Sequence, residues 1–402
     1  MSDHITKLLA KGVVIPRPES VFVSADVNVD LVESGSVLYP GSRIEGKMTC
    51  IGSGSRIGSE GPAVVINCRI GRKVNLGSGF FEASVFLDDA SMGGGAHVRP
   101  GCLLEEQASG AHTVGLKQTV LMSYVTLGSL VNFCDCLMSG GTSRKNHSEV
   151  GSSYIHFNFT PHQDKATPSL IGDAVHGVLL DQPAIFLGGQ GGLVGPTKLA
   201  FGTIIPAGQI IRSDALEPNH LVRGHQAVSG SRPYDAKIYG AVKRVFANNL
   251  EYIGNIRALH AWYEYIRYPF AGSNAIQQSC NKGAREALNL IVDERIRRLA
   301  ELVEKLKISI DELGRKTDER SVAHLLEQQE IVSAWPAVKA GLESHDKAVD
   351  DHPDMKIVRE HAVTAGRSMG YLEWIASMKQ EVKTHAVQWL QTLVGVHCKL
   401  YH

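Results

Sequence analysis

Within the glycine-rich first half of this chain, polar side chains are densest in one stretch, from Ser139 to Asp173. Residues 144–165 alone supply cations, imidazoles, carboxylates and an amide: Arg144, Lys145, His147, Glu149, His156, Asn158, His162, Asp164 and Lys165. His147 and Glu149 could form an acid–base pair, because an imidazole titrates near neutral pH. The neighbouring cations could hold a phosphate. The stretch therefore predicts proton transfer on a phosphorylated ligand, with a solvated surface loop as the alternative.

A regular repeat surrounds this stretch and must position it. An aliphatic residue followed by glycine returns at six-residue spacing in Ile51–Gly58 and again in Ile70–Gly77. Hexapeptides of this kind build a parallel β-helix, in which the aliphatic residue points inward and the small residue turns the corner. The pattern recurs at Met92-Gly93, Val98, Leu104, Val114-Gly115, Val120, Leu127-Gly128, Phe133, Val150-Gly151, Ile171-Gly172 and Phe201-Gly202.

The repeat predicts a left-handed parallel β-helix over residues 31–228, preceded by a lead-in over residues 1–30. A stacked coil cannot bury many charges, so we expect an inserted polar loop near residues 139–170 on its outer surface. Loops carried by a rigid scaffold often hold functional groups, and Gly140-Gly141 permits a close approach of the backbone.

The architecture changes after Ser229–Pro233, where the glycine pattern stops and apolar residues fall at helical spacing. Four amphipathic stretches predict a C-terminal α-helical bundle over residues 234–402. The apolar stripe from Leu288 to Ile310 fits a helix within its own bundle or a coiled coil between subunits.

The overall composition excludes several classes of function. Lys plus Arg and Asp plus Glu number 41 each in 402 residues, so we expect neither a nucleic acid nor an anionic membrane as a partner. The N-terminus has no secretory pattern, and no apolar stretch is long enough to span a bilayer. Seven scattered cysteines do not form a disulfide framework. These features predict a cytoplasmic protein.

Val150–Phe159 resembles the Ile-Gly-Ala-Gly-Thr…Asn-Tyr-Asp-Gly segment of the bifunctional N-acetylglucosamine-1-phosphate uridyltransferase/glucosamine-1-phosphate acetyltransferase family. Lys165 with Ile171-Gly172-Asp173, and Phe186–Pro196 with Ile205–Gly208, resemble later segments of the same family. The resemblance covers roughly residues 100–225 and lies in the acetyltransferase half. Nothing resembles the Gly-rich signature of the nucleotidyltransferase half, so we expect no such domain in this chain.

The resemblance implies a homotrimer that transfers an acetyl group from acetyl-CoA to a sugar phosphate or UDP-sugar carrying an amine, with no metal required. His147 would be the base and Glu149 would orient it. The remaining roles carried over are phosphate contacts by Lys117, Arg144, Lys145 and Lys165, an acceptor or acetyl contact by Asn158, and cofactor contacts by Phe159, Gly189 and Ala207.

Departures from the family pattern keep two alternatives open. The Asn-Tyr-Asp-Gly segment becomes Asn158-Phe159-Thr160-Pro161, and the position of the family's catalytic histidine falls on Asp135. Both changes favour a non-catalytic protein of the same fold that binds sugar nucleotides or serves as a scaffold. The other alternative is a zinc site resembling the γ-class carbonic anhydrases, for which the available histidines are His112, His147, His156 and His162.

Overall fold

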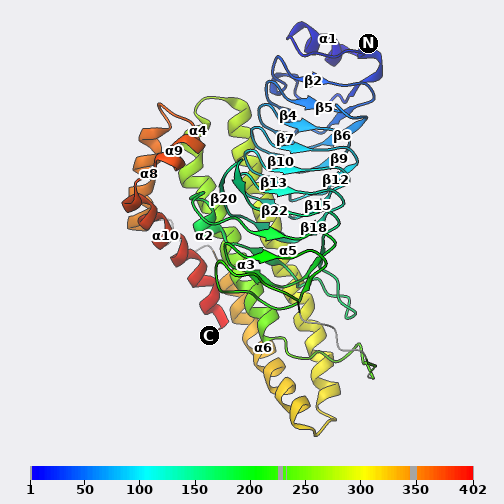
Figure 1. Cartoon of the computed structure of the whole chain (residues 1–402), viewed down its shortest axis with the longest axis vertical. Coiled ribbons are helices and arrows are strands. Elements are labelled where there is room, and N and C mark those ends of the chain that lie inside the picture. Colours follow the sequence, from blue (N-terminus) through cyan, green and yellow to red (C-terminus); the bar gives the residue numbers. More distant parts are fainter. Residues whose placement is uncertain (1, 225–229, 232, 345–350, 402) are drawn as a thin grey trace.

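Short parallel strands follow one another through the first half of the chain and stack into three flat faces of a coil (Figure 1). The computed structural model describes residues 2–224, 230–231, 233–344 and 351–401. The strands extend from β1 (Phe22–Val23) to β29 (Ile210–Ile211), and α-helices follow from α3 (Lys243–Ala261) onward. The predicted parallel β-helix followed by a helical region is confirmed.

We name the three faces by their numbers of strands. The ten-strand face contains β1, β3 (Arg43–Glu45), β6 (Ala63–Ile66), β9 (Gly79–Glu82), β12 (Ala96–Val98), β15 (Gly115–Lys117), β18 (Asn132–Cys134), β23 (Ile155–Phe157), β26 (Gly192–Val194) and β29. The eight-strand face contains β4 (Cys50–Ile51), β7 (Arg69–Ile70), β10 (Val85–Phe86), β13 (Leu103–Leu104), β16 (Val120–Leu121), β19 (Cys136–Met138), β24 (Ser169–Ile171) and β27 (Lys198–Leu199). The nine-strand face contains β2 (Val37–Leu38), β5 (Arg56–Ile57), β8 (Asn75–Leu76), β11 (Ser91–Met92), β14 (Ser109–Gly110), β17 (Thr126–Leu127), β22 (Glu149–Val150), β25 (Phe186–Leu187) and β28 (Ile204–Ile205).

Three corners connect these faces in each turn of the coil. Corner 1 leads from the ten-strand to the eight-strand face, corner 2 from there to the nine-strand face, and corner 3 back to the ten-strand face. Corners require unusual backbone angles: Gly46 has a φ of +88°, and a Cβ atom there would lie 2.3 Å from Asn67 Oδ1. Glycine avoids this clash, although Asn67, Ala83 and Asp135 also adopt positive φ angles at the same corner of other turns.

The aliphatic residues of the repeat fill the interior of the coil. Ile57, Leu76, Leu187 and Ile205 on the nine-strand face are all 0% exposed. The period of the repeat thus sets the core, because each buried aliphatic side chain contributes about 1.5–3 kcal/mol relative to an exposed one. One insertion leaves the coil at corner 2, where β20 (Gly141–Ser143) and β21 (Asn146–His147) form an antiparallel hairpin.

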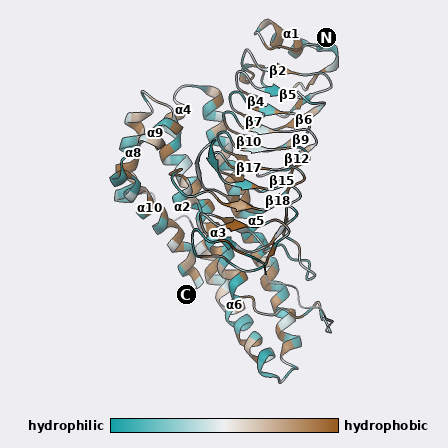
Figure 2. Ribbon diagram, in the orientation of Figure 1, coloured by the Kyte–Doolittle hydropathy of each residue, from teal (hydrophilic) through white to brown (hydrophobic). Residues whose placement is uncertain are grey.

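Most of the C-terminal helices lie along one flank of the coil, whereas α1 lies at its N-terminal end and α6 extends beyond its other end (Figure 1). The short helices are α1 (Asp3–Ala10), α2 (Ala174–Gly177), α4 (Tyr268–Ala271) and α9 (Tyr371–Ser377), together with the π-helical segment η3 (Trp262–Arg267) and the 3-10 segments η1 (Pro18–Ser20), η2 (Val29–Leu31) and η4 (Lys399–Tyr401). The longer ones after α3 are α5 (Ala275–Leu313), α6 (Glu319–Glu343), α8 (Pro353–Ala365) and α10 (Gln380–Cys398). None of the described helices is both long and apolar enough to cross a bilayer, and polar and apolar residues are interspersed along the helices (Figure 2).

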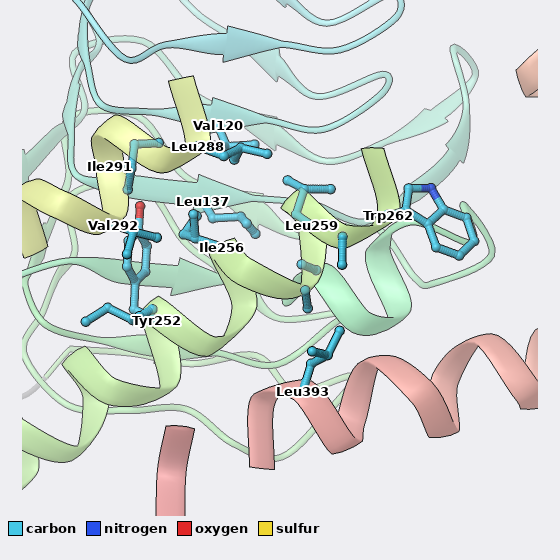
Figure 3. Close-up of a cluster of buried hydrophobic side chains, with 14 of the residues drawn as sticks. Val120, Leu137, Tyr252, Ile256, Leu259, Trp262, Leu288, Ile291, Val292 and Leu393 are labelled. Carbon is cyan, nitrogen blue, oxygen red and sulfur yellow. The ribbon is translucent and has the colours of Figure 1, made fainter. Parts of the chain in front are cut away.

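The helical region and the eight-strand face share one hydrophobic core. Val120 and Leu137 from the strands lie beside Ile256 of α3 and Leu288 and Ile291 of α5 (Figure 3). The predicted apolar stripe of α5 is buried within the chain, with Leu299, Leu302 and Leu306 at most 1% exposed. The stripe therefore packs in its own subunit.

Candidate functional site

Corner 1 gathers cations from successive turns of the coil. Val98 pairs with Leu116, and Lys117 pairs with Cys134, so Arg99, Lys117 and Cys134 occupy equivalent positions where three successive strands end. Arg99 Nη2 lies 3.2 Å from Cys134 Sγ. The charges of Arg99, Lys117 and Lys165 all act to lower the pKa of this thiol. Its pKa is nevertheless raised, chiefly by burial and also by the negative charge of Asp135. Three cations around one point can bind a phosphate group.

Asp135 follows Cys134 in this corner and is held by groups on both sides. Its Oδ1 accepts a hydrogen bond of 2.8 Å from Arg295 Nη2 of α5, and its Oδ2 accepts one of 2.9 Å from Asn158 Nδ2. Arg295 Nη1 also donates to the Lys165 carbonyl oxygen at 2.8 Å. The helical region therefore inserts a guanidinium group into corner 1 and fixes the residues around it.

The contact with Asp135 determines how the Asn158 amide is oriented. Because Nδ2 faces the carboxylate, Oδ1 is the end of the amide that is left to accept a hydrogen from a ligand. Within the described residues, no donor reaches Asn158 Oδ1, while the Asn158 main-chain oxygen accepts from Thr167 Oγ1 at 3.0 Å. Asn158 is half-buried and lies beside the cation cluster, so it can contact a bound acceptor.

His156 is buried on the inner side of β23 and has a structural role. Its Nδ1 lies 2.6 Å from the Cys134 carbonyl oxygen and its Nε2 lies 2.8 Å from Ser169 Oγ. Burial lowers its pKa to about 4. Both ring nitrogens are occupied, so His156 is not available as a base or a metal ligand.

The polar loop after β23 is tied to the helical region. The His162 ring stacks on Tyr239 with centroids 4.0 Å apart, and Lys305 Nζ donates to the His162 carbonyl oxygen at 2.8 Å. Asp164 accepts from Thr160 Oγ1 at 2.7 Å and from Tyr239 Oη at 3.0 Å. These contacts hold the loop that carries Asn158 and Lys165.

The predicted acid–base pair lies at corner 2, in the hairpin. His147 Nδ1 is 2.9 Å from the Arg144 carbonyl oxygen, so in the neutral ring Nδ1 carries the hydrogen and Nε2 keeps its lone pair. Nε2 lies 3.9 Å from Glu149 Oε2, which is within ion-pair range but longer than a hydrogen bond. The side chain of His147 is 20% exposed and that of Glu149 is 49% exposed.

Arg144 fastens this hairpin to the preceding turns. Its Nη1 donates to the carbonyl oxygens of Gln107 at 3.0 Å and Tyr124 at 2.9 Å, and to Thr126 Oγ1 at 3.0 Å. Lys145, next to it, is exposed. Arg144 thus keeps the His147 imidazole in place at the edge of the nine-strand face.

The residues predicted for the site occupy all three corners of one chain. Lys117, Asn158, Phe159 and Lys165 lie at corner 1, where Phe159 is 63% exposed. Arg144, Lys145, His147 and Glu149 lie at corner 2, and Gly189 and Ala207 lie at corner 3. Each corner brings its own set together, but a single chain does not bring the three sets into one pocket.

The histidines proposed for zinc are equally dispersed. His112 lies at corner 3, His147 at corner 2, His156 inside the coil and His162 in the loop of corner 1. Across the described residues, no group of three or more His, Cys, Asp or Glu side chains could hold a metal ion.

Sequence reasoning missed Arg99 and Arg295. Arg99 could have been found from its position one turn before Lys117 in the repeat. Arg295 has a subtler signal, because it lies between Val292 and Ile296 on the buried stripe of α5, where an unpaired charge would be costly. Its partner Asp135 is 160 residues away in the sequence, so the sequence alone could not name it.

Comparisons with known proteins identify distant relatives of this chain. Bifunctional protein GlmU from Thermotoga maritima is 27% identical over 214 residues, which are 52% of this chain and 42% of the relative. Bifunctional protein GlmU from Lawsonia intracellularis is 30% identical over 226 residues, 55% of this chain and 44% of the relative. No family model matches the chain.

The predicted resemblance is thus confirmed at the level of distant homology over about half of the chain, together with the β-solenoid fold. The chain spans less than half the length of these relatives, at 42% and 44%.

Proposed function

We propose that this protein transfers an acyl group from acetyl-CoA to the amine of a phosphorylated or nucleotide-linked amino sugar. The observation that carries the proposal is the cluster of Arg99, Lys117 and Lys165 beside Asn158, on a coil distantly homologous to GlmU. The cations neutralise the phosphate, and Asn158 Oδ1 accepts a hydrogen from the acceptor. His147 takes the proton from the amine as it attacks the thioester carbonyl carbon and the CoA thiolate leaves.

This reaction needs corner 1 and corner 2 at one place, which a homotrimer would provide. Exposed apolar residues lie on the last turns of both faces that flank corner 3: Ile155, Phe157 and Ile210 on the ten-strand face, and Phe186 and Ile204 on the nine-strand face. The eight-strand face is instead packed against α3 and α5. Three chains with corner 3 at a common axis would each place a nine-strand face against the neighbour's ten-strand face.

In that arrangement, the outer edges of the two contacting faces also meet. The outer edge of the nine-strand face is corner 2, with His147, and the outer edge of the ten-strand face is corner 1, with Lys117 and Asn158. The base of one chain would therefore serve the phosphate cluster of the next. Gly189 and Ala207 would lie near the axis, where the small residues allow the chains to approach closely.

A second function is favoured by the ion pair of Asp135 and Arg295. Asp135 occupies the position where the sequence count places the family's catalytic histidine, and both of its oxygens are engaged. Among the described residues, the side chain at this position is thus not a free base, as expected for a non-catalytic binder of sugar nucleotides.

Titration calorimetry separates the two functions. Glucosamine 1-phosphate and acetyl-CoA are titrated separately into the wild-type protein and into Lys117→Ala and Lys73→Ala variants. A transferase should bind both compounds. Lys117→Ala should weaken binding of the sugar phosphate, whereas Lys73→Ala should not, because Lys73 is an exposed lysine on an earlier turn. Binding of the sugar phosphate alone supports the non-catalytic function, and binding of neither compound contradicts both.

A further inference from the structure

A groove with a volume of about 410 Å³ crosses the ten-strand face and reaches the cation cluster of corner 1. Residues of β12, β15 and β18 and of the adjoining corners line it. Leu130 lies at its corner 3 end, and Arg99, which belongs to the cation cluster, lies at its corner 1 end. The volume falls in the range of small-molecule sites, which begins at about 300 Å³. The groove therefore offers space for a further part of a ligand whose phosphate binds at corner 1.

The cations of corner 1 are available to an external anion. In the parts of the chain that the structure describes, Arg99, Lys117 and Lys165 form no ion pair with an aspartate or a glutamate. Apart from Arg99, the groove is lined by His97 and by uncharged residues. A ligand with an anionic group at one end and an uncharged group along the groove would match this arrangement. A nucleotide has this polarity, with phosphate at one end and a base at the other.

Outward-facing residues of neighbouring strands form a ladder along the ten-strand face, and Gly115 leaves a gap in it. His97 pairs with Phe80 on one side and with Gly115 on the other, and Gly115 pairs with Asn132. Because neighbouring strands lie about 4.8 Å apart, His97 and Asn132 are about 9.6 Å apart along the ladder. Gly115 contributes no side chain between them, so the gap accommodates one planar ring. We call this gap the Gly115 slot.

The walls of the Gly115 slot can recognise a base. The His97 ring stacks on Phe80, with centroids 5.2 Å apart and planes at 26°, so its opposite face is directed toward the slot. On the other side, Asn132 Oδ1 lies 3.4 Å from the position that a Cβ atom of Gly115 would occupy. An amide offers an acceptor oxygen beside a donor nitrogen, which is complementary to the carbonyl oxygen and N–H group on the edge of uracil.

The Gly115 slot and the cation cluster are one nucleoside apart. Lys117 follows Gly115 by two residues on β15, and Arg99 follows His97 by two residues. Residues two apart on a strand point to the same side and are separated by about 6.6 Å. This separation is close to the length of the ribose that links a base to its phosphate.

We propose that the site prefers a uridine-nucleotide-linked amino sugar to a sugar monophosphate. The base stacks on His97 in the Gly115 slot, and the phosphates bind Arg99 and Lys117. This inference rests on the proposed function and narrows its acceptor. In the proposed trimer, the groove would open into the seam between neighbouring chains, on the ten-strand face that meets the neighbour's nine-strand face.

Titration calorimetry on the full chain compares uridine 5′-monophosphate with ribose 5-phosphate, which lacks only the base. The wild-type protein should bind the nucleotide at one site per chain and about tenfold more tightly than ribose 5-phosphate, because the base stacks on an aromatic ring.

Gly115→Val should abolish this difference, because the valine side chain fills the Gly115 slot. The substitution should not disturb the coil, since a Cβ atom at Gly115 would lie no closer than 3.4 Å to its nearest neighbour. His97→Ala should reduce the difference by removing the stacking surface. The matched control is Val64→Leu, three strands earlier on the same ladder, which should retain the difference. Thermal melting checks that each variant folds.

The inference is overturned if the wild-type protein binds ribose 5-phosphate as tightly as the nucleotide, or if Gly115→Val retains the same difference as Val64→Leu. Glucosamine 1-phosphate, titrated in parallel, separates this result from a failure of the proposed function. If glucosamine 1-phosphate binds and the nucleotide has no advantage over ribose 5-phosphate, only the Gly115 slot is wrong. If none of the three phosphates binds, the phosphate site of the proposed function is wrong as well.

Discussion

Arg295 of α5 and Asp135 of the coil form an ion pair of 2.8 Å that joins the two halves of the chain, with side chains only 1% and 3% exposed. The same guanidinium group donates to the Lys165 carbonyl oxygen, and the same carboxylate accepts from Asn158. The helical region therefore fixes two residues of the proposed phosphate site. This contact gives the C-terminal half a role in building the site.

Removal of Arg295 should destabilise the protein strongly. Arg295→Met leaves the Asp135 carboxylate buried without its cation, which typically costs about 3–5 kcal/mol of unfolding free energy. Urea denaturation followed by circular dichroism measures the change. The matched control is Arg297→Met on the same helix. The Arg297 side chain is 53% exposed, so its ion pairs should contribute less than about 1 kcal/mol to the unfolding free energy. Equal losses in the two variants would contradict the role of the buried pair.

His156 should make stability depend on pH. Its pKa is lowered from 6.5 to about 4 by burial, so between these values the unfolded chain binds a proton that the folded chain does not. The unfolding free energy should therefore fall as the pH decreases from 6.5 toward 4, by up to about 1.4 kcal/mol per pH unit from this group.

Denaturation curves across this pH range measure the effect in matched variants. His156→Gln should remove this part of the slope, while His112→Gln, at an exposed position, should retain it. A slope that is the same in both variants would show that His156 is not the responsible group.

The exposed apolar residues on the two open faces should control assembly. Phe186 is 41% exposed and Ile204 is 46% exposed on neighbouring strands of the nine-strand face. Phe186→Asp combined with Ile204→Asp should convert the proposed trimer to monomers without lowering the melting temperature of the subunit core. Light scattering after size-exclusion chromatography gives the mass. Phe22→Asp, equally exposed at the far end of the coil, should remain trimeric; a wild-type monomer would refute the proposed assembly.

The sequence predicts the coil well because its period is a local property. Ile57 and Leu76 reveal their inward positions through spacing alone, and both are 0% exposed. The helices are equally predictable from the sequence, since Leu299, Leu302 and Leu306 fall on one stripe. Spacing within the repeat thus determines which side chains form the core.

The arrangement of the site is much harder to predict. His147 and Lys117 are 30 residues apart in the sequence but lie at different corners, because the chain passes through four strands of the coil, from β16 to β19, between them. The contact of Arg295 with Asp135 depends on how a distant helix packs on the coil, which no local pattern encodes. Sequence reasoning therefore named most of the polar residues of the proposed site but not the corner of the coil that each of them occupies.

The rate of acetyl transfer from acetyl-CoA to glucosamine 1-phosphate, followed by release of the CoA thiol, tests the central claim most directly. The wild-type protein should release thiol only when the amino sugar is present. His147→Ala should reduce the turnover rate about 10²–10⁴-fold, while His112→Ala should leave it unchanged. Wild-type turnover that His147→Ala does not alter would contradict the assignment of the base, and no amino-sugar-dependent thiol release from the wild-type protein would contradict acetyl transfer to this acceptor.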